Sequence, residues 1–163
     1  MRLGNKVRPA QNAKTMTDGG SELDLFAAAF QTCTISKSDW THHAHLKVGL
    51  WHIVKFGRDE ALTRLRSGIR RLNESHAVPN SDSRGYHETF TCTYVQLIDE
   101  FIRNLPESMS IDEAVQHLLS SRLAHKDFLL TFYSRDLLMS RRARLEYVEP
   151  DLAPALLHAG GVQ

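Results

Sequence analysis

The sequence predicts an all-α fold, a single helical bundle of about five main helices, from three observations. Apolar residues recur at the helical spacing of three and four along most of the chain after residue 20. No stretch shows the sustained alternation of apolar and polar residues that marks a half-buried strand. Capping residues and Gly or Pro breaks separate the helical segments. A length of 163 residues suits one domain with its own core.

Residues 1 to 20 are expected to form a disordered tail, so that the helical domain covers residues 21 to 163. The tail contains Pro and Gly, lacks hydrophobic periodicity and carries mainly basic charge. The helices then follow one another without an internal repeat.

The first predicted helix covers about residues 21 to 32 and opens with a capping-box pattern. Ser38 is the predicted cap of a second helix, which Gly57 ends. Asp59 is the predicted cap of a third helix, and the tight connection makes the second and third helices antiparallel. The apolar stripe of this third helix comprises Leu62, Leu65, Ile69 and Leu72.

A fourth helix is predicted over YHETFTCTYVQLIDEFIRN, with Ser83 as its cap, and it ends before Pro106. Ser110 and Glu113 form a capping-box pattern for a fifth helix, which extends to about Ala124. Short helical pieces and a Pro-containing tail complete the chain. In an up-down-up succession, the second and fourth helices run parallel with their N-termini at the same end.

Composition narrows the classes of function. A formal net charge of +1 argues against a dedicated nucleic-acid binder, and no run approaches the roughly 18 apolar residues of a membrane span. The two cysteines lack metal-type spacing and no signal-type apolar stretch opens the chain, so we expect a reducing cytoplasm. Two arginine clusters are interpreted as solvated helix faces: Arg64, Arg66, Arg70 and Arg71, and Arg135, Arg141, Arg142 and Arg144.

Four of the nine histidines lie in one segment, DWTHHAHLKVGLWHIVKFG, which otherwise has the pattern of an apolar helix. A buried imidazole costs free energy unless it is hydrogen-bonded or ligated. At about 100° per residue, His42 and His45 fall on one inward stripe, while His43 lies at its edge. The same construction points His87 inward on the fourth helix. If both helices begin at their predicted caps, parallel packing brings these imidazoles together.

Glu88 adds a carboxylate at the flank of the same face. Together, His42, His45, His87 and Glu88 form a candidate metal site, whose donors suit zinc, iron, manganese, nickel or cobalt. Glu88 is alternatively a residue that orients a ligand, or a general base. The H-x-x-H pair alone is a weak signal. The structural alternative is that the three histidines are hydrogen-bonded and Glu88 favours the helix dipole.

Two helix N-termini at this site would disfavour a cation and favour an anion. A carboxylate ligand or a metal-bound hydroxide would offset that effect. Otherwise the same geometry forms an anion-binding pocket, in which neutral imidazoles act as donors or as acid/base groups. Both interpretations remain open on the sequence.

At WTHHAHL, GYHETFT, FYSRDLL and YVEPDLAPAL, the chain resembles small bacterial all-helical proteins of an uncharacterised family. That family has an aromatic-T-H-x-x-H-L segment and a Y-H-E-T segment, and the resemblance covers nearly everything after residue 20. It implies no activity. The family pattern groups His42, His45, His87 and Glu88, whereas His43 falls at a variable position.

Two functions fit these observations. The first is a His-rich, metal-binding pocket at one end of a helical bundle, in a small metal-dependent enzyme that acts on an unidentified small molecule. The second is a non-enzymatic bundle that binds a ligand or a partner helix and uses its histidines structurally. Metal found in protein purified without a polyhistidine tag would separate them.

Overall fold

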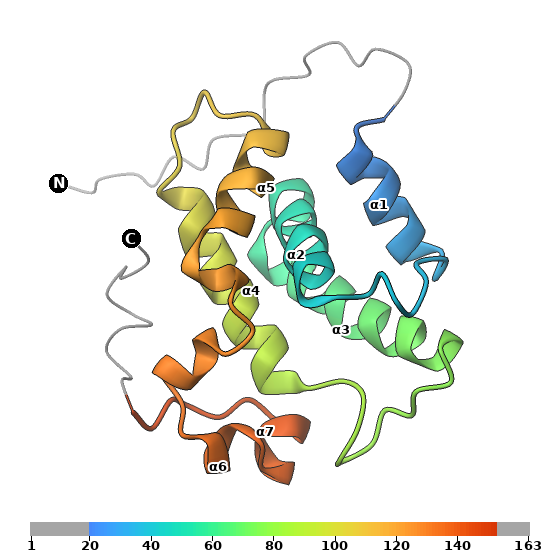
Figure 1. The fold of residues 1–163 in the computed structure, drawn as a ribbon, viewed down its shortest axis with the longest axis vertical. Coiled ribbons are helices and arrows are strands. Elements are labelled where there is room, and N and C mark those ends of the chain that lie inside the picture. The colour runs from blue at the N-terminus through green and yellow to red at the C-terminus, as the bar shows by residue number, and fades with distance from the viewer. Residues whose placement is uncertain (1–19, 153–163) are drawn as a thin grey trace, which may run out of the picture.

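The computed structural model describes residues 20 to 152, and every regular element within that range is a helix, as the sequence predicts (Figure 1). The elements are α1 (Glu22–Gln31), α2 (His42–Phe56), α3 (Arg58–Ser75), α4 (Glu88–Arg103), α5 (Ile111–Ser120), the 3-10 turns η1 (Arg122–Ala124) and η2 (Phe128–Thr131), α6 (Arg135–Leu138) and α7 (Arg141–Leu145). Apart from Gly20, the predicted tail lies outside the described residues. Between residues 20 and 152, none of the helices combines the length and apolar character needed to cross a bilayer.

Two helices begin at the capping boxes that the sequence indicates. In each, a serine hydroxyl accepts from the backbone N–H three residues on, and the carboxylate at that position accepts from the serine N–H. The pairs are Ser21 with Asp24 for α1, and Ser110 with Glu113 for α5. The fifth helix is shorter than predicted, because it ends at Ser120 and Ser121 caps the separate turn η1.

A single residue, Gly57, joins α2 to α3. Its φ of 78° lies in the left-handed region, which glycine adopts without steric cost. The second helix ends there as predicted, but α3 begins at once at Arg58 instead of after a cap at Asp59. The second helix also starts later than predicted, because the Thr41 hydroxyl and not that of Ser38 caps it.

The start of α4 differs most from the prediction. His87 is the residue before the helix, not its fourth residue, and its Nδ1 accepts from the Phe90 N–H at 3.3 Å. The Nε2–H of the same ring donates to the Leu138 carbonyl at 2.9 Å. Ser83, the predicted cap, lies in the preceding loop, where its N–H bonds the Ser81 hydroxyl. His87 is therefore a helix cap that also ties α4 to the last residue of α6.

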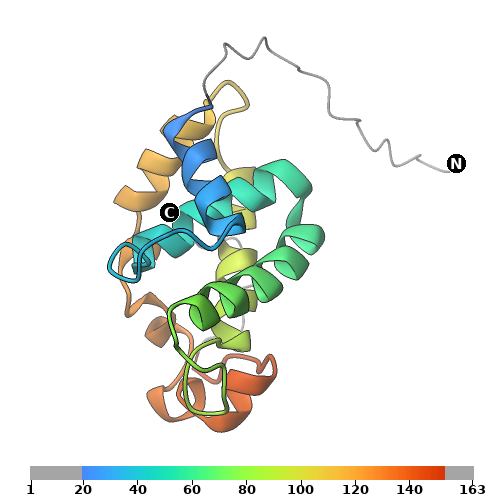
Figure 2. The same ribbon diagram turned by 90° about the vertical axis from the view of Figure 1, so that its right-hand side faces the viewer.

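The second and fourth helices cross, so the predicted parallel arrangement is wrong. In Figure 1, α2 is seen nearly end-on while α4 runs diagonally across the view. After the turn to Figure 2, α2 lies across the molecule and α4 stands upright. The central helix is α2, which packs against α1, α3, α4 and α5 and buries most of its length. Its N-terminus therefore does not lie beside that of α4.

The chain after α5 is fastened to α4 by buried hydroxyl groups. The Tyr133 hydroxyl donates to the Val148 carbonyl at 3.1 Å and lies 3.1 Å from the Thr93 hydroxyl. Thr89 donates to the Glu146 carbonyl at 3.0 Å and accepts from the Val148 N–H at 3.2 Å. These bonds fix α7 against the first turns of α4.

Candidate functional site

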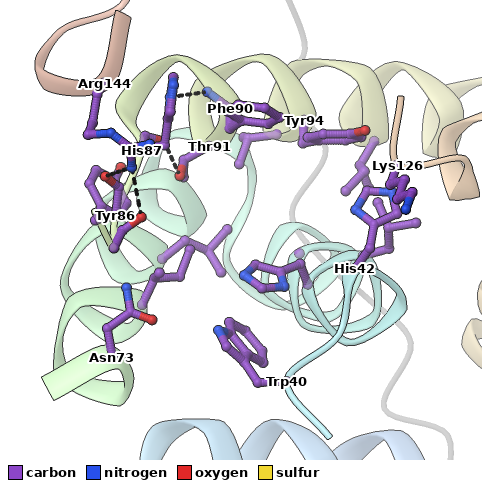
Figure 3. A pocket seen from close by; sticks show the side chains of 18 of the residues that line it. Trp40, His42, Asn73, Tyr86, His87, Phe90, Thr91, Tyr94, Lys126 and Arg144 are labelled. Carbon is purple, nitrogen blue, oxygen red and sulfur yellow. Dashed lines mark hydrogen bonds between the residues drawn. The ribbon is translucent and has the colours of Figure 1, made fainter. Parts of the chain in front are cut away.

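A pocket of about 560 Å³ lies among α2, α3 and α4, with α7 at one end and the connection from η1 to η2 at the other (Figure 3). That volume is in the range that accommodates a small organic ligand. The walls are largely aromatic and aliphatic. The polar and charged residues of the lining are His42, His45, Asn73, Tyr86, His87, Thr91, Tyr94, Lys126 and Arg144.

All three predicted histidines line this pocket, but they do not converge on one point. The Nε2–H of His42 donates to the Leu123 carbonyl at 2.9 Å, and that of His87 donates to the Leu138 carbonyl. In Figure 3, His42 and His87 lie at opposite ends of the pocket. Within residues 20 to 152, no three or more His, Cys, Asp or Glu side chains are grouped so that they could hold a metal ion.

His45 presents a nitrogen with a free lone pair. Its Nδ1 lies 2.8 Å from the Thr41 carbonyl, and because a carbonyl can only accept, Nδ1 carries the proton. The Nε2 atom is then an acceptor, and no hydrogen bond from the described residues reaches it. The imidazole packs on the Trp40 indole, with ring centroids 3.8 Å apart.

The three imidazoles are neutral at pH 7. Burial lowers the pKa of His45 to about 4, although its bond to the Thr41 carbonyl opposes the shift. Burial also lowers the pKa of His87 to about 4, and the nearby charge of Arg144 acts in the same direction. The pKa of His42 is lowered for the same main reason. The positive charge of the pocket lining therefore comes from lysine and arginine.

Glu88 lies outside the pocket lining, in a cluster with Arg66, Tyr86 and Cys92 that we call the Glu88 cluster. Its Oε1 accepts from Arg66 Nε at 2.9 Å and from Cys92 Sγ at 3.1 Å, and Arg66 Nη2 bonds the same oxygen. Its Oε2 accepts from the Tyr86 hydroxyl at 2.8 Å. Burial opposes ionisation, but the bonds from Arg66, Cys92 and Tyr86 hold the pKa of Glu88 below its usual value. Both oxygens of this ionised carboxylate are occupied.

Tyr94 carries the one buried side-chain polar atom without a hydrogen-bond partner in the described part of the chain. Its ring meets the His42 ring edge-on, with centroids 5.2 Å apart. Burial raises the pKa of the phenol, and the charge of Asp127 adds to the shift, so the hydroxyl is a protonated donor at neutral pH. An unpaired buried hydroxyl costs about 1–3 kcal/mol. A small shift of the ring would let a ligand atom in the pocket accept from the hydroxyl and recover that cost.

Arg144 is the site residue that the sequence interpretation misses. The arginine cluster predicts a solvated face, and Arg141 and Arg142 do form ion pairs at the surface. Arg144 instead is half-buried, and its Nη1 donates to the carbonyls of Gly85 at 3.1 Å and Tyr86 at 3.3 Å. A run of arginines gives no signal that separates the one directed inward.

The pocket thus combines apolar walls, an imidazole acceptor, a phenol donor and two cations, and this set of groups suits a small organic molecule. The resemblance to an uncharacterised helical family stays a prediction. Neither a family model nor a curated protein nor a solved structure matches the chain to a significant degree.

Proposed function

We propose that this protein binds a small organic molecule with an aromatic or other apolar body in the pocket among α2, α3 and α4. The observation that carries the proposal is the pocket itself, which offers about 560 Å³ of space between largely aromatic and aliphatic walls with a few polar groups. Buried polar atoms are nearly always hydrogen-bonded in folded proteins. The buried Tyr94 hydroxyl beside the pocket has no partner among the described residues, and a small shift of its ring would let it donate to a ligand acceptor.

The remaining lining supports the same proposal. Aliphatic side chains from three helices would cover an apolar ligand body, and burial of apolar surface contributes about 25 cal/mol per Å². The Trp40 indole and the His45 ring packed against it at a tilt of 32° offer aromatic contact surface. The free Nε2 of His45 would accept a hydrogen bond from the ligand. These groups fix both the position and the orientation of a bound molecule.

The neutral dye N-phenyl-1-naphthylamine is a suitable probe, because its fluorescence rises when it leaves water for an apolar site. We expect saturable binding of one dye per chain. Replacing Ile69, which lines the pocket from α3, by Trp should lower the affinity about tenfold by filling the space. Leu62→Trp is the matched control, because Leu62 is also half-buried on α3 but lies outside the lining.

Equal loss of affinity in both variants, or fluorescence that never saturates, would contradict the proposal. Circular dichroism of each variant establishes that the helices are intact before the dye is added.

A metal-dependent enzyme that acts on a small molecule is the second candidate. His45 favours it, because metal-bound imidazoles commonly donate one ring N–H to a carbonyl and ligate through the other nitrogen. Both ring nitrogens of His87 are already bonded, so His87 would have to release Phe90 N–H or the Leu138 carbonyl, and Glu88 would have to release its partners. His42 would have to approach from the opposite end of the pocket. The site proposed from the sequence therefore requires local rearrangement.

Thermal-shift titration of the untagged protein tests this second candidate. Zinc, iron(II), manganese, nickel or cobalt would raise the melting temperature at neutral pH by mass action, and the gain would shrink near about pH 5.5 as protons compete. The metal-dependent part of the shift should vanish in His87→Ala and persist in His43→Ala. A wild-type protein that none of these metals stabilises, or equal effects of the two variants, would exclude the metal site.

A further inference from the structure

We infer that the ligand of this pocket carries an anionic group, a carboxylate, sulfonate or phosphate, and that Arg144 binds that group at one end of the pocket. The inference rests on the proposed function, because it names the chemical class of the molecule that the pocket takes. Four features of the described residues support it: the charge of the lining, the partners of Arg144, the position of Arg70 and the distribution of polar groups along the pocket.

The lining has two cations, Lys126 and Arg144, and none of the described residues that line it is a carboxylate. Neither cation forms an ion pair with a carboxylate within residues 20 to 152. The negative charge of Glu88 lies behind the wall and is neutralised by Arg66. Asp127 follows Lys126 in the chain, and its negative charge partly offsets the positive charge of Lys126 at that end of the pocket. The uncompensated positive charge is therefore concentrated at Arg144.

Arg144 is oriented for a ligand before one arrives. Two carbonyls, those of Gly85 and Tyr86, take hydrogen bonds from Nη1. A guanidinium has five N–H donors, and no described residue accepts from its Nη2 or Nε. A charged group that is partly removed from water without a counter-ion costs free energy, which an anion with two oxygens would offset through paired, charge-assisted bonds.

The residues around Arg144 add to this preference. Arg70 lies over the Tyr86 ring, 3.9 Å from guanidinium carbon to ring centroid, and contributes a second positive charge at the same end. His87 lies beside Arg144 in Figure 3, and its imidazole is uncharged at neutral pH, so it adds no further positive charge. This end of the pocket would therefore attract an anion through Arg70 and Arg144.

The polar groups also indicate how the ligand lies. Arg144 and Tyr86 are at one end of the pocket, while Tyr94, His42 and Lys126 are toward the other (Figure 3). Between them the walls are mainly aromatic and aliphatic. The molecule that fits has its anion at Arg144 and an apolar body that extends toward the end where Tyr94, His42 and Lys126 lie.

Two dyes with the same aromatic body test the inference. 8-Anilinonaphthalene-1-sulfonate carries a sulfonate, whereas N-phenyl-1-naphthylamine lacks it. We expect the wild type to bind the sulfonate about tenfold more tightly or better, as one charge-assisted contact predicts. Arg144→Gln should remove this preference, because it should lower the affinity for the sulfonate far more than the affinity for the neutral dye. Arg142→Gln, on the same helix but exposed and paired with Glu146, should change neither affinity.

Each outcome separates the inference from the proposed function. Saturable binding of neither dye contradicts the proposed function. Equal affinity for both dyes, or equal loss of both in Arg144→Gln, overturns the anionic ligand while leaving a pocket for small molecules. If Arg144→Gln does not fold, Arg144→Lys serves instead, because it keeps the charge but loses the paired bonds and should give an intermediate preference. In the wild type, salt should weaken binding of the sulfonate alone.

Discussion

The Glu88 cluster and the pocket share the Tyr86 side chain, yet they differ in how their polar groups are satisfied. In the Glu88 cluster, both carboxylate oxygens are bonded and the charge is balanced by Arg66. In the pocket, the Tyr94 hydroxyl is unpaired and Arg144 has no carboxylate partner within the described chain. The first arrangement stabilises the fold, while the second leaves polar and charged groups without protein partners, and a ligand can bind such groups.

This difference gives a physical criterion for where function resides. The sequence pattern assigns Glu88 to the site because it stands next to His87. A carboxylate whose two oxygens are both bonded and whose charge is balanced by Arg66 has little left to offer a ligand. Buried groups that lack partners cost stability, and such groups are retained where something else supplies the partner. The predictions below test the two regions separately.

Acid should produce the largest loss in the free energy of unfolding, and this loss should come first from protonation of the pocket histidines. His45 and His87 have folded-state pKa values of about 4, below the value of 6.5 for an unperturbed imidazole. As the pH falls from 6.5, the unfolded chain binds protons that the folded protein resists, so stability is complete above pH 6.5 and is lost progressively toward pH 4. The loss approaches about 3 kcal/mol for each imidazole.

Urea unfolding between these two pH values measures that loss. A free energy of unfolding that does not change with pH over this range would contradict the burial of neutral imidazoles.

Disruption of the Glu88 cluster should lower the free energy of unfolding nearly as much. Glu88→Ala removes the acceptor of Arg66, Tyr86 and Cys92 at once, and we expect a loss of about 3 kcal/mol at neutral pH. Glu60→Ala is the matched control, since Glu60 pairs with Arg64 on an exposed helix face and such pairs contribute about 0.5 kcal/mol or less. Similar losses from the two substitutions in urea unfolding would show that the cluster is not a structural element.

Removal of the unpaired phenol should have the smallest effect. Without ligand, Tyr94→Phe should leave stability unchanged or raise it by up to about 1 kcal/mol, because it deletes a buried hydroxyl that has no partner. Tyr133→Phe should instead lower stability by about 1 kcal/mol, because it removes the donor to the Val148 carbonyl. Thermal melts of both variants provide the comparison, and a destabilised Tyr94→Phe would mean that the hydroxyl is already satisfied.

Local signals predicted the helices well and their exact starts less well. The capping boxes at Ser21 and Ser110 and the break at Gly57 are confirmed, because each is decided by residues within one turn. The segments before α2 and α4 contain several residues that can cap. Thr41 and His87 are the residues that cap these helices, because tertiary packing selects among the candidates.

The site was predicted in part. His42, His45 and His87 do share one pocket, as the inward stripe indicates. Their convergence was wrong, because it depended on parallel helices and on a cap at Ser83, and helix crossing is set by side-chain packing that loop length does not reveal. Arg144 could not be found, since only the folded structure shows which arginine lines the pocket.

The contacts of Arg144 also have a consequence for the order in which the protein folds. Its guanidinium donates to the carbonyl groups of Gly85 and Tyr86, which lie 59 and 58 residues earlier in the chain. The helices α2 and α3, by contrast, are joined by one residue. A polypeptide made from its N-terminus can pair α2 with α3 while α7 is still unsynthesised. The cationic end of the pocket then forms late in folding, after the chain has closed a long loop. A ligand present at that moment would trap the finished fold and so increase the yield of native protein.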